Sequence, residues 1–129
     1  MQYADPELLI GAWLHQQTGL KIWTDRDWQG NERFTAAVAH LQRAPGSDNL
    51  ALSLDDVLFD VDVYAASVTH ARDAANAIWA AMVFQLPRHT FDNGVFVTGV
   101  TAVTRPCWAP DPRLKRRTAA YRVILHGVI

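Results

Sequence analysis

The sequence contains a single cysteine, Cys107, in 129 residues. One cysteine excludes a disulfide framework within the chain and any metal cluster built from several cysteines. It also fits a reducing, cytosolic environment. A lone thiol that follows Pro106 and has no histidine near it in sequence is usually a half-buried residue, so we assign it no catalytic role.

An excess of charge of one sign is also missing, as are long apolar runs. Twelve Lys and Arg residues face thirteen Asp and Glu, for a formal net charge of −1. Bulk electrostatics therefore give no reason to expect nucleic acid or membrane binding. No apolar run approaches the ~20 residues of a membrane-spanning helix, and residues 1–11 lack the basic start of a signal peptide. We expect a soluble protein without membrane partners.

Motifs of common catalytic sites are absent too. The sequence has no GxSxG, GxxxxGK[ST] or GxGxxG. The histidines fall in separate expected elements without the spacing of a metal motif. They are His15, His40, His70, His89 and His126. The sequence therefore predicts no enzyme, no cofactor and no metal site.

The strongest local signal that is present lies in residues 55–86. Residues 57–64 alternate between two sides, which is typical of a strand with one buried face. From Val68 to Leu86, apolar residues recur every three or four positions, as in a helix with one apolar stripe. Ser67 is suited to cap that helix. We expect the helix to pack on the apolar face of the strand.

Weaker signals place the other elements. In order they are a helix from Asp5 to Gly19, strands at 20–24 and 33–42, a turn at 44–49, a strand at 50–64, the long helix, a strand at 94–104, a loop at 105–117 with three prolines, and a strand at 119–128. The alanine-rich segment 33–42 fits helix or strand. We favour a strand because turns bracket it and another strand follows.

These elements predict one domain over residues 1–129. The class is α+β, with two helices packed on one mostly antiparallel sheet in the order α-β-β-β-α-β-β.

Two aspartates lie on the polar side of the expected strand at 50–64. Asp60 and Asp62 point the same way and are about 7 Å apart at ~3.3 Å per residue. Paired carboxylates can perform acid–base chemistry or bind a divalent ion. Because no loop rich in Gly or Asn accompanies them, we favour a solvated strand face. A third interpretation is that they line a negatively charged opening in an oligomer.

A basic run forms the counterpart of these acids. Its four cations are Arg113, Lys115, Arg116 and Arg117. They could contact phosphates, pair with acids of a neighbouring subunit, or be solvated. Only Trp108 and Tyr121 supply aromatic rings nearby and the net charge is negative, so nucleic acid is disfavoured as the main ligand.

Three segments of the chain follow one another in an order that is informative. The first is the opening helix followed by KIWTD, and the second is FDVDVYAASVTHARDAANAIWAAM. The third is RPCWAPDPRLKRRTAAYRVIL, in which a Pro-x-Trp-x-Pro-Asp-Pro loop and basic residues precede a closing strand. Over nearly its whole length the chain resembles the tail terminator proteins of phages with long, non-contractile tails, especially actinobacterial phages and prophages. Residues 25–42 depart from the pattern, because they are rich in alanine where a more β-branched strand is usual.

The resemblance implies a structural role in virion assembly. Tail terminators form a hexameric ring that caps the tail tube, ends tube polymerisation and offers a surface for head docking. The implied partners are copies of the chain, the tail tube protein and a head-side connector protein, while DNA only passes through the lumen. The implied location is the virion tail at the head–tail junction, after assembly in the host cytoplasm.

The resemblance also implies working surfaces. The expected inter-subunit or tube-facing residues are Trp28, Trp108, Asp111, Arg113, Lys115, Arg116 and Arg117. Asp60 and Asp62 are candidates for facing the lumen, where like charge would keep DNA from sticking. Three alternatives stay open: a connector stopper of the same particle, a small α+β enzyme that gathers His and Asp from separate elements, and a nucleic-acid module.

Overall fold

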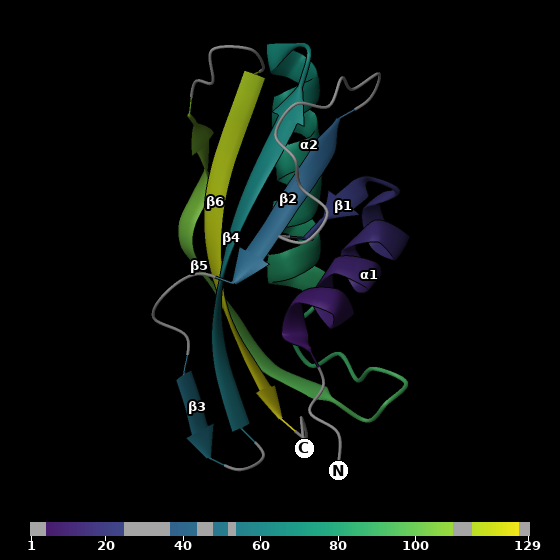
Figure 1. The fold of residues 1–129 in the computed structure, drawn as a ribbon, viewed down its shortest axis with the longest axis vertical. Coiled ribbons are helices and arrows are strands. Elements are labelled where there is room, and N and C mark those ends of the chain that lie inside the picture. The colour runs from purple at the N-terminus through teal and green to yellow at the C-terminus, as the bar shows by residue number, and fades with distance from the viewer. Residues whose placement is uncertain (1–4, 25–36, 44–47, 52–53, 110–114, 127–129) are drawn as a thin grey trace.

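The structure is a computed structural model that describes residues 5–24, 37–43, 48–51, 54–109 and 115–126. The predicted α+β class and the order α-β-β-β-α-β-β are confirmed, with a short additional strand, β3, which is off the main path of the sheet. Figure 1 shows the elements in space. They are α1 (Pro6–Thr18), β1 (Lys21–Trp23), β2 (Val38–Arg43), β3 (Asp48–Ala51), β4 (Leu54–Ala65), α2 (Val68–Ala80), the π-helical turn η1 (Ala81–Gln85), β5 (Phe96–Trp108) and β6 (Lys115–His126).

The described strands form one sheet in the order β1-β2-β4-β6-β5, and β3 pairs with β4 beside this path. The β1–β2 pair is parallel and the other described pairs are antiparallel. β4 pairs with β2, β3 and β6, and its register with β6 runs from Leu54–His126 to Ala65–Lys115. The strand with the strongest sequence signal is therefore the centre of the sheet.

The packing predicted between β4 and the long helix is confirmed. Val57, Phe59, Val61 and Val63 of β4 are at most 2% exposed. The opposing buried stripe of α2 and the segment after it consists of Ala71, Ala75, Ile78, Met82 and Leu86. Val68, which the stripe was predicted to include, is 43% exposed. The core thus lies between the sheet and one layer of helices.

Both helices begin at the predicted caps. An Asp5 carboxylate oxygen accepts a hydrogen bond from the Glu7 backbone N–H at 3.0 Å. The Ser67 hydroxyl accepts one from the His70 backbone N–H at 3.1 Å. These bonds satisfy donors that the first turn of a helix leaves free. α1 ends at Thr18 and is capped by Gly19, whose φ of 73° suits glycine.

Gly11 lies in the middle of α1 and faces the sheet. A Cβ atom there would meet the side chains of Ile22 and Leu41 at 3.7 Å, an ordinary van der Waals distance. Alanine loses less backbone entropy than glycine in a helix, so Gly11→Ala should raise the free energy of unfolding by roughly 0.5–1 kcal/mol. Urea denaturation measures the change.

Gly19→Ala is the matched control for this prediction. Because residue 19 has a φ of 73°, a side chain there is strained and stability should fall. A lower denaturation midpoint for Gly11→Ala would contradict the prediction and show that the contact between α1 and the sheet rejects a methyl group.

The loop predicted at 105–117 is wrong at both ends. β5 continues through Pro106 to Trp108, and β6 begins at Lys115. A proline is tolerated there because β5 is an edge strand and its register with β6 shifts between Thr104 and Cys107. Residues 110–114 lie outside the described part of the chain.

Further boundaries differ from the prediction. The single strand predicted at 50–64 is wrong at its start, because Leu50 and Ala51 belong to β3 and β4 begins at Leu54. The strand predicted at 33–42 is confirmed for β2, whereas 25–36 lie outside the described residues. The turn predicted at 44–49 is wrong for Asp48 and Asn49, which pair with β4 as part of β3. Polar residues there favoured a turn locally, but pairing with β4 supplies the backbone hydrogen bonds of a strand.

Candidate functional site

One end of the β5–β6 pair brings together Trp108 and the described part of the basic run. Trp108 pairs with Arg117 in the register of the two strands. The Ala109 backbone N–H donates to the Arg116 carbonyl at 3.0 Å, and the Arg116 Nε–H donates to the Ala109 carbonyl at 3.0 Å. These residues are thus held on a paired strand rather than on a loop.

Two cations lie over the ring of Trp108. Lys115 Nζ is 6.0 Å and Arg117 Cζ is 5.8 Å from the ring centroid. Both distances are near the limit of a useful cation–π contact, which is about 6 Å. Trp108 is 42% exposed, and Lys115 is exposed as well. The cations are therefore only loosely engaged and remain able to meet a partner.

A second aromatic cluster lies between α2 and β5. Arg105 Cζ lies 4.7 Å from the centroid of the Trp79 ring. Phe84 meets the same ring edge to face at 5.2 Å and is 70% exposed. This cluster was not predicted from the sequence, because Trp79 and Phe84 fall outside the apolar stripe of the long helix. Large aromatic residues off a buried stripe are the signal that could have found it.

Both clusters lie on the side of the sheet that carries the helices. Arg105 lies over Trp79 of α2, and Trp108 pairs with Arg117, which in turn pairs with Val63 on the buried side of β4. We call the combined surface the cation–aromatic face; its members are Trp79, Phe84, Arg105, Trp108, Lys115 and Arg117.

The cation–aromatic face has more donors than acceptors. Within the described residues, the ion pairs are Arg43–Asp55 and Arg122–Asp56, neither of which involves this face. The buried Trp79 Nε1–H and Arg117 Nε–H find no acceptor among those residues. Buried donors left in this state cost stability. Arg105 and Lys115 on this face are exposed, so the face is suited to a partner that supplies carboxylates or carbonyls to these two cations.

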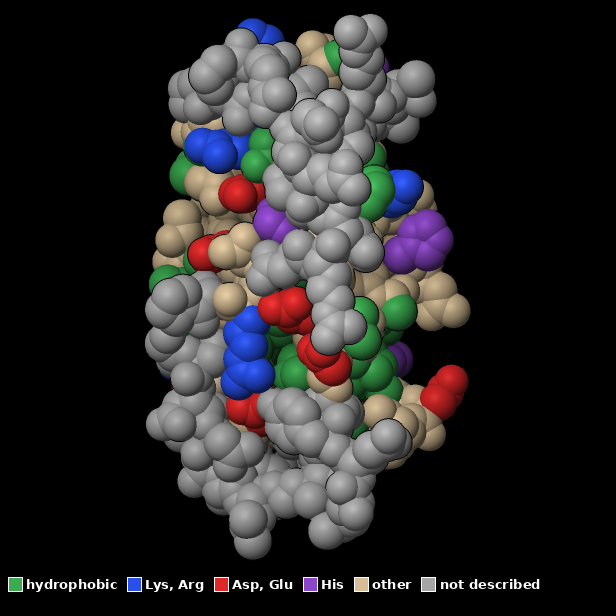
Figure 2. Space-filling model, in the orientation of Figure 1, with side chains coloured by type: hydrophobic (Ala, Val, Ile, Leu, Met, Phe, Trp, Pro, Cys, Tyr) green, Lys and Arg blue, Asp and Glu red, His purple; other side chains and the backbone are tan. Residues whose placement is uncertain are grey.

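Asp60 and Asp62 lie on the opposite side of the sheet. Their cross-strand neighbours are Gln42, His40, Ala120 and Thr118. Both aspartates are half-buried, and in the described structure neither forms an ion pair. Figure 2 views the molecule from this side, where acidic side chains reach the surface. The interpretation as a fully solvated strand face is therefore too simple.

Burial, and secondarily the charge of Asp62, raises the pKa of Asp60. A carboxyl with a raised pKa stabilises the fold fully below its unfolded pKa of about 3.9 and loses that contribution as the pH rises through the folded pKa. Asp60→Asn removes this loss, so the melting temperature should rise at pH 7 and change less at about pH 3.5.

Thermal melts at both pH values check the Asp60 prediction. Asp73→Asn, at an exposed site on α2, controls for the removal of one negative charge. An equal shift for Asp60→Asn at the two pH values, or a lower melting temperature at pH 7, would reject a carboxylate cost at this position.

Two more aspartates, Asp55 and Asp56, lie near the start of β4 and stabilise the fold. Asp55 is fully buried and lies 3.5 Å from the Arg43 guanidinium. Asp56 accepts a hydrogen bond from Arg122 at 2.8 Å. The Arg43 backbone N–H donates to the Glu7 carboxylate at 2.8 Å, which ties α1 to the end of β2.

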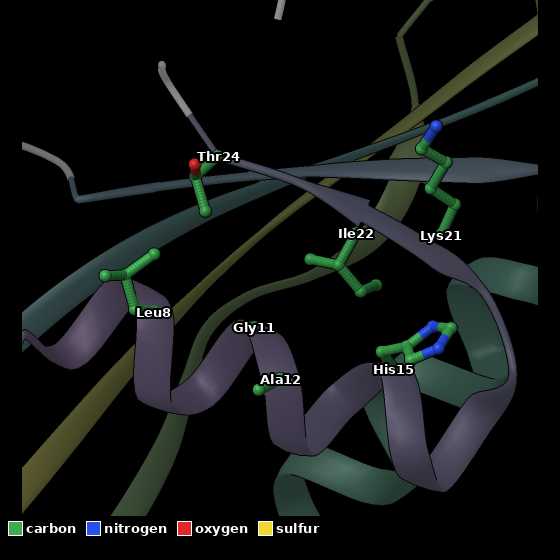
Figure 3. Close-up of a pocket in the computed structure, with 7 residues that line it drawn as sticks. All are labelled: Leu8, Gly11, Ala12, His15, Lys21, Ile22 and Thr24. Carbon is green, nitrogen blue, oxygen red and sulfur yellow. The ribbon is translucent and has the colours of Figure 1, made fainter. Parts of the chain in front are cut away.

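Two clefts flank α1. The one in Figure 3 has a volume of about 320 Å³ and lies between α1 and β1. His15 lines it, and its Nδ1 is 2.7 Å from the Leu20 carbonyl oxygen. The other cleft, of about 610 Å³, contains Trp13 and Phe91, which both contact the His89 ring. Across the described residues, no group of three or more His, Cys, Asp and Glu could hold a metal ion.

Several residues singled out in the sequence do not belong to the cation–aromatic face or to the Asp60 and Asp62 pair. Trp28, Asp111 and Arg113 lie outside the described residues. Cys107 is exposed, not half-buried as predicted, because it lies on the edge strand β5. Its Sγ is 3.6 Å from the Thr118 carbonyl oxygen.

No protein-family model and no curated protein sequence matches the chain. None of the described helices is long and apolar enough to cross a membrane.

Proposed function

We propose that this chain is a structural subunit that caps a phage tail tube as a ring, ends polymerisation of the tube and provides the surface on which the head docks. The resemblance of its three segments to tail terminators supports this role, as does the α+β fold on which those segments lie. The observation that carries the proposal is the cation–aromatic face. Exposed Trp, Phe and Arg side chains gathered on one surface are typical of protein–protein contacts.

The position of this face at a sheet edge supports an assembly role. β5 is a 13-residue edge strand, and its outer side pairs with no other described strand. Val103 on this strand is 54% exposed. Long edge strands with exposed apolar side chains invite pairing or docking, and soluble proteins usually protect them. A contact with another subunit or with the tube would cover such a surface.

A ring needs two different contact surfaces on each subunit, because subunits in a ring meet head to tail. The cation–aromatic face offers one of them. Asp60 and Asp62, on the other side of the sheet, have two places in such a ring: the lumen, as the resemblance implies, or the contact between neighbouring subunits. Either place gives the chain a blocking and docking role that needs no bond chemistry and no cofactor.

The mass of the purified protein, alone and mixed with tail tube subunits of the same phage or prophage, tests this function. Native mass spectrometry should find a sixfold ring that binds the tube, and tubes grown with the protein present should stop elongating. A protein that neither assembles nor binds the tube would contradict the proposal. Binding to the head-side ring but not to the tube would identify a connector stopper instead.

A further inference from the structure

We infer that the cation–aromatic face of one copy binds the side of the sheet that carries Asp60 and Asp62 in a second copy, so that subunits join head to tail through opposite charges. The inference rests on the proposed function only for the closure of these contacts into a ring. The contact itself follows from surfaces on the chain.

The cationic half of the contact has no acidic partner among the residues that the structure describes. Arg105, Lys115 and Arg117 each lie over a tryptophan ring, and in the described structure no carboxylate lies within 4.0 Å of them. A guanidinium stacked on an aromatic ring still has free N–H groups at its edge. Arg105, at 4.7 Å from the centroid of the Trp79 ring, is held in place by this stacking, so less side-chain entropy is lost when a carboxylate binds it.

The acidic half of the contact, Asp60 and Asp62, has no cationic partner among the described residues. Asp60 and Asp62 project from one strand to the same side and are half-buried. Like charges placed this close on a sheet destabilise it unless a cation lies between them. Asp73 and Asp92 are each exposed to solvent and are not paired with another acid, so a cationic partner would stabilise them less. The pair at 60 and 62 is thus the acceptor that the face of a second copy fits best.

The two halves lie on opposite sides of the sheet, which decides the kind of assembly. A surface that binds a different surface on the next copy makes a heterologous contact, and such contacts produce rings or filaments rather than twofold dimers. Phe84 and Trp108, at 70% and 42% exposure, add apolar area beside the charges. An interface with aromatic anchors and charged neighbours has the composition of a specific contact.

A charge-swap experiment tests the contact. Arg105→Glu/Lys115→Glu alters two exposed cations, and Asp60→Lys/Asp62→Lys alters the acids. Each pair should weaken self-association by about 10- to 100-fold, as measured by light scattering and native mass spectrometry. In an equimolar mixture, the new acids of one variant meet the new lysines of the other, and the unaltered cations and aspartates also meet. The mixture should therefore associate better than either variant alone. Circular dichroism confirms that each variant folds.

Matched controls separate a specific contact from a general effect of charge. Arg72→Glu and Asp73→Lys, on the exposed surface of α2, should leave association unchanged. Association of the unaltered chain should also weaken as salt increases, because the contact is electrostatic. A chain in which all four charges are swapped should recover association, since opposite charges face each other again.

The outcomes distinguish this inference from the proposed function. If a ring forms and caps the tube with either charge pair altered, the inference is overturned and the function stands. In that case Asp60 and Asp62 face the lumen rather than a neighbouring subunit, which is why their replacement leaves the mass of the ring unchanged. If the chain associates through these charges but does not bind the tube, the function fails and the contact stands. Binding of single-stranded DNA that Arg105→Glu/Lys115→Glu abolishes, with self-association unchanged, would assign the face to nucleic acid and overturn the inference.

Discussion

Replacing Phe59 with alanine should lower the free energy of unfolding by about 3–5 kcal/mol, the usual cost of removing a buried aromatic ring. Phe59 is fully buried on the central strand β4. Its cross-strand neighbours are Arg43 on β2 and Tyr121 on β6. Paired strands on both sides hold the backbone in place, so the cavity left by the ring cannot close by a shift of the strand.

Chemical denaturation of Phe59→Ala and of the unaltered chain measures this loss. Phe84→Ala is the matched control, because it removes the same ring from a position that is 70% exposed. Its cost should stay below about 1 kcal/mol, since little of the ring leaves water on folding. Equal losses at the two positions would contradict the packing described for β4.

The sequence predicted the centre of the fold well, because there the local pattern and the tertiary packing agree. Alternation along residues 57–64 and the three-to-four spacing after Val68 each identify one buried face, and the structure places these faces against each other. Ser67 and Gly19 were identifiable because their chemistry satisfies helix ends without help from distant residues. Such signals depend on neighbours in sequence only.

The prediction was wrong where a strand's position in the sheet overrides local preference. Three prolines between 105 and 117 indicated a loop, yet β5 passes through Pro106. An edge strand with shifted register tolerates a residue without an N–H. The local sequence does not indicate which strand lies at the edge of the sheet. Asp48 and Asn49 have turn chemistry, but β4 is long enough to pair with them as well as with β2.

The candidate site was predictable only in part, for a related reason. Trp108 and the basic run are close in sequence, so their grouping on one surface was predictable. The structure adds that Lys115 and Arg117 lie over the Trp108 ring. Trp79 joins them through contacts between α2 and β5, which are distant in sequence. The half-buried state of Asp60 and Asp62 was not predictable, because alternation assigns a side of a strand without telling what surrounds it.

Tyr121→Phe should raise the free energy of unfolding, in contrast to Phe59→Ala. Tyr121 is fully buried on β6, and its hydroxyl finds no hydrogen-bond partner among the described residues. Burying an unpaired hydroxyl costs about 1–3 kcal/mol, and phenylalanine keeps the ring while removing that group. The gain at pH 7 should be of this order.

The same substitution has a pH dependence whose sign follows from burial. Burial raises the pKa of the Tyr121 hydroxyl. In the unfolded chain the hydroxyl ionises near pH 10, while in the folded chain it stays neutral, so the stability present below about pH 10 is lost as the pH rises further. Phenylalanine cannot ionise. The advantage of Tyr121→Phe should therefore grow by up to about 1.4 kcal/mol for each pH unit above that value.

Urea denaturation at pH 7 and near pH 10.5 measures both effects. Tyr64→Phe is the control, because Tyr64 is also buried but its hydroxyl is not among the buried atoms without a partner. It should bring no gain at pH 7. If Tyr121→Phe instead lowers stability at pH 7, the hydroxyl forms a hydrogen bond in solution. In that case the position is a polar anchor between the sheet and its helices rather than a site where polarity is a cost.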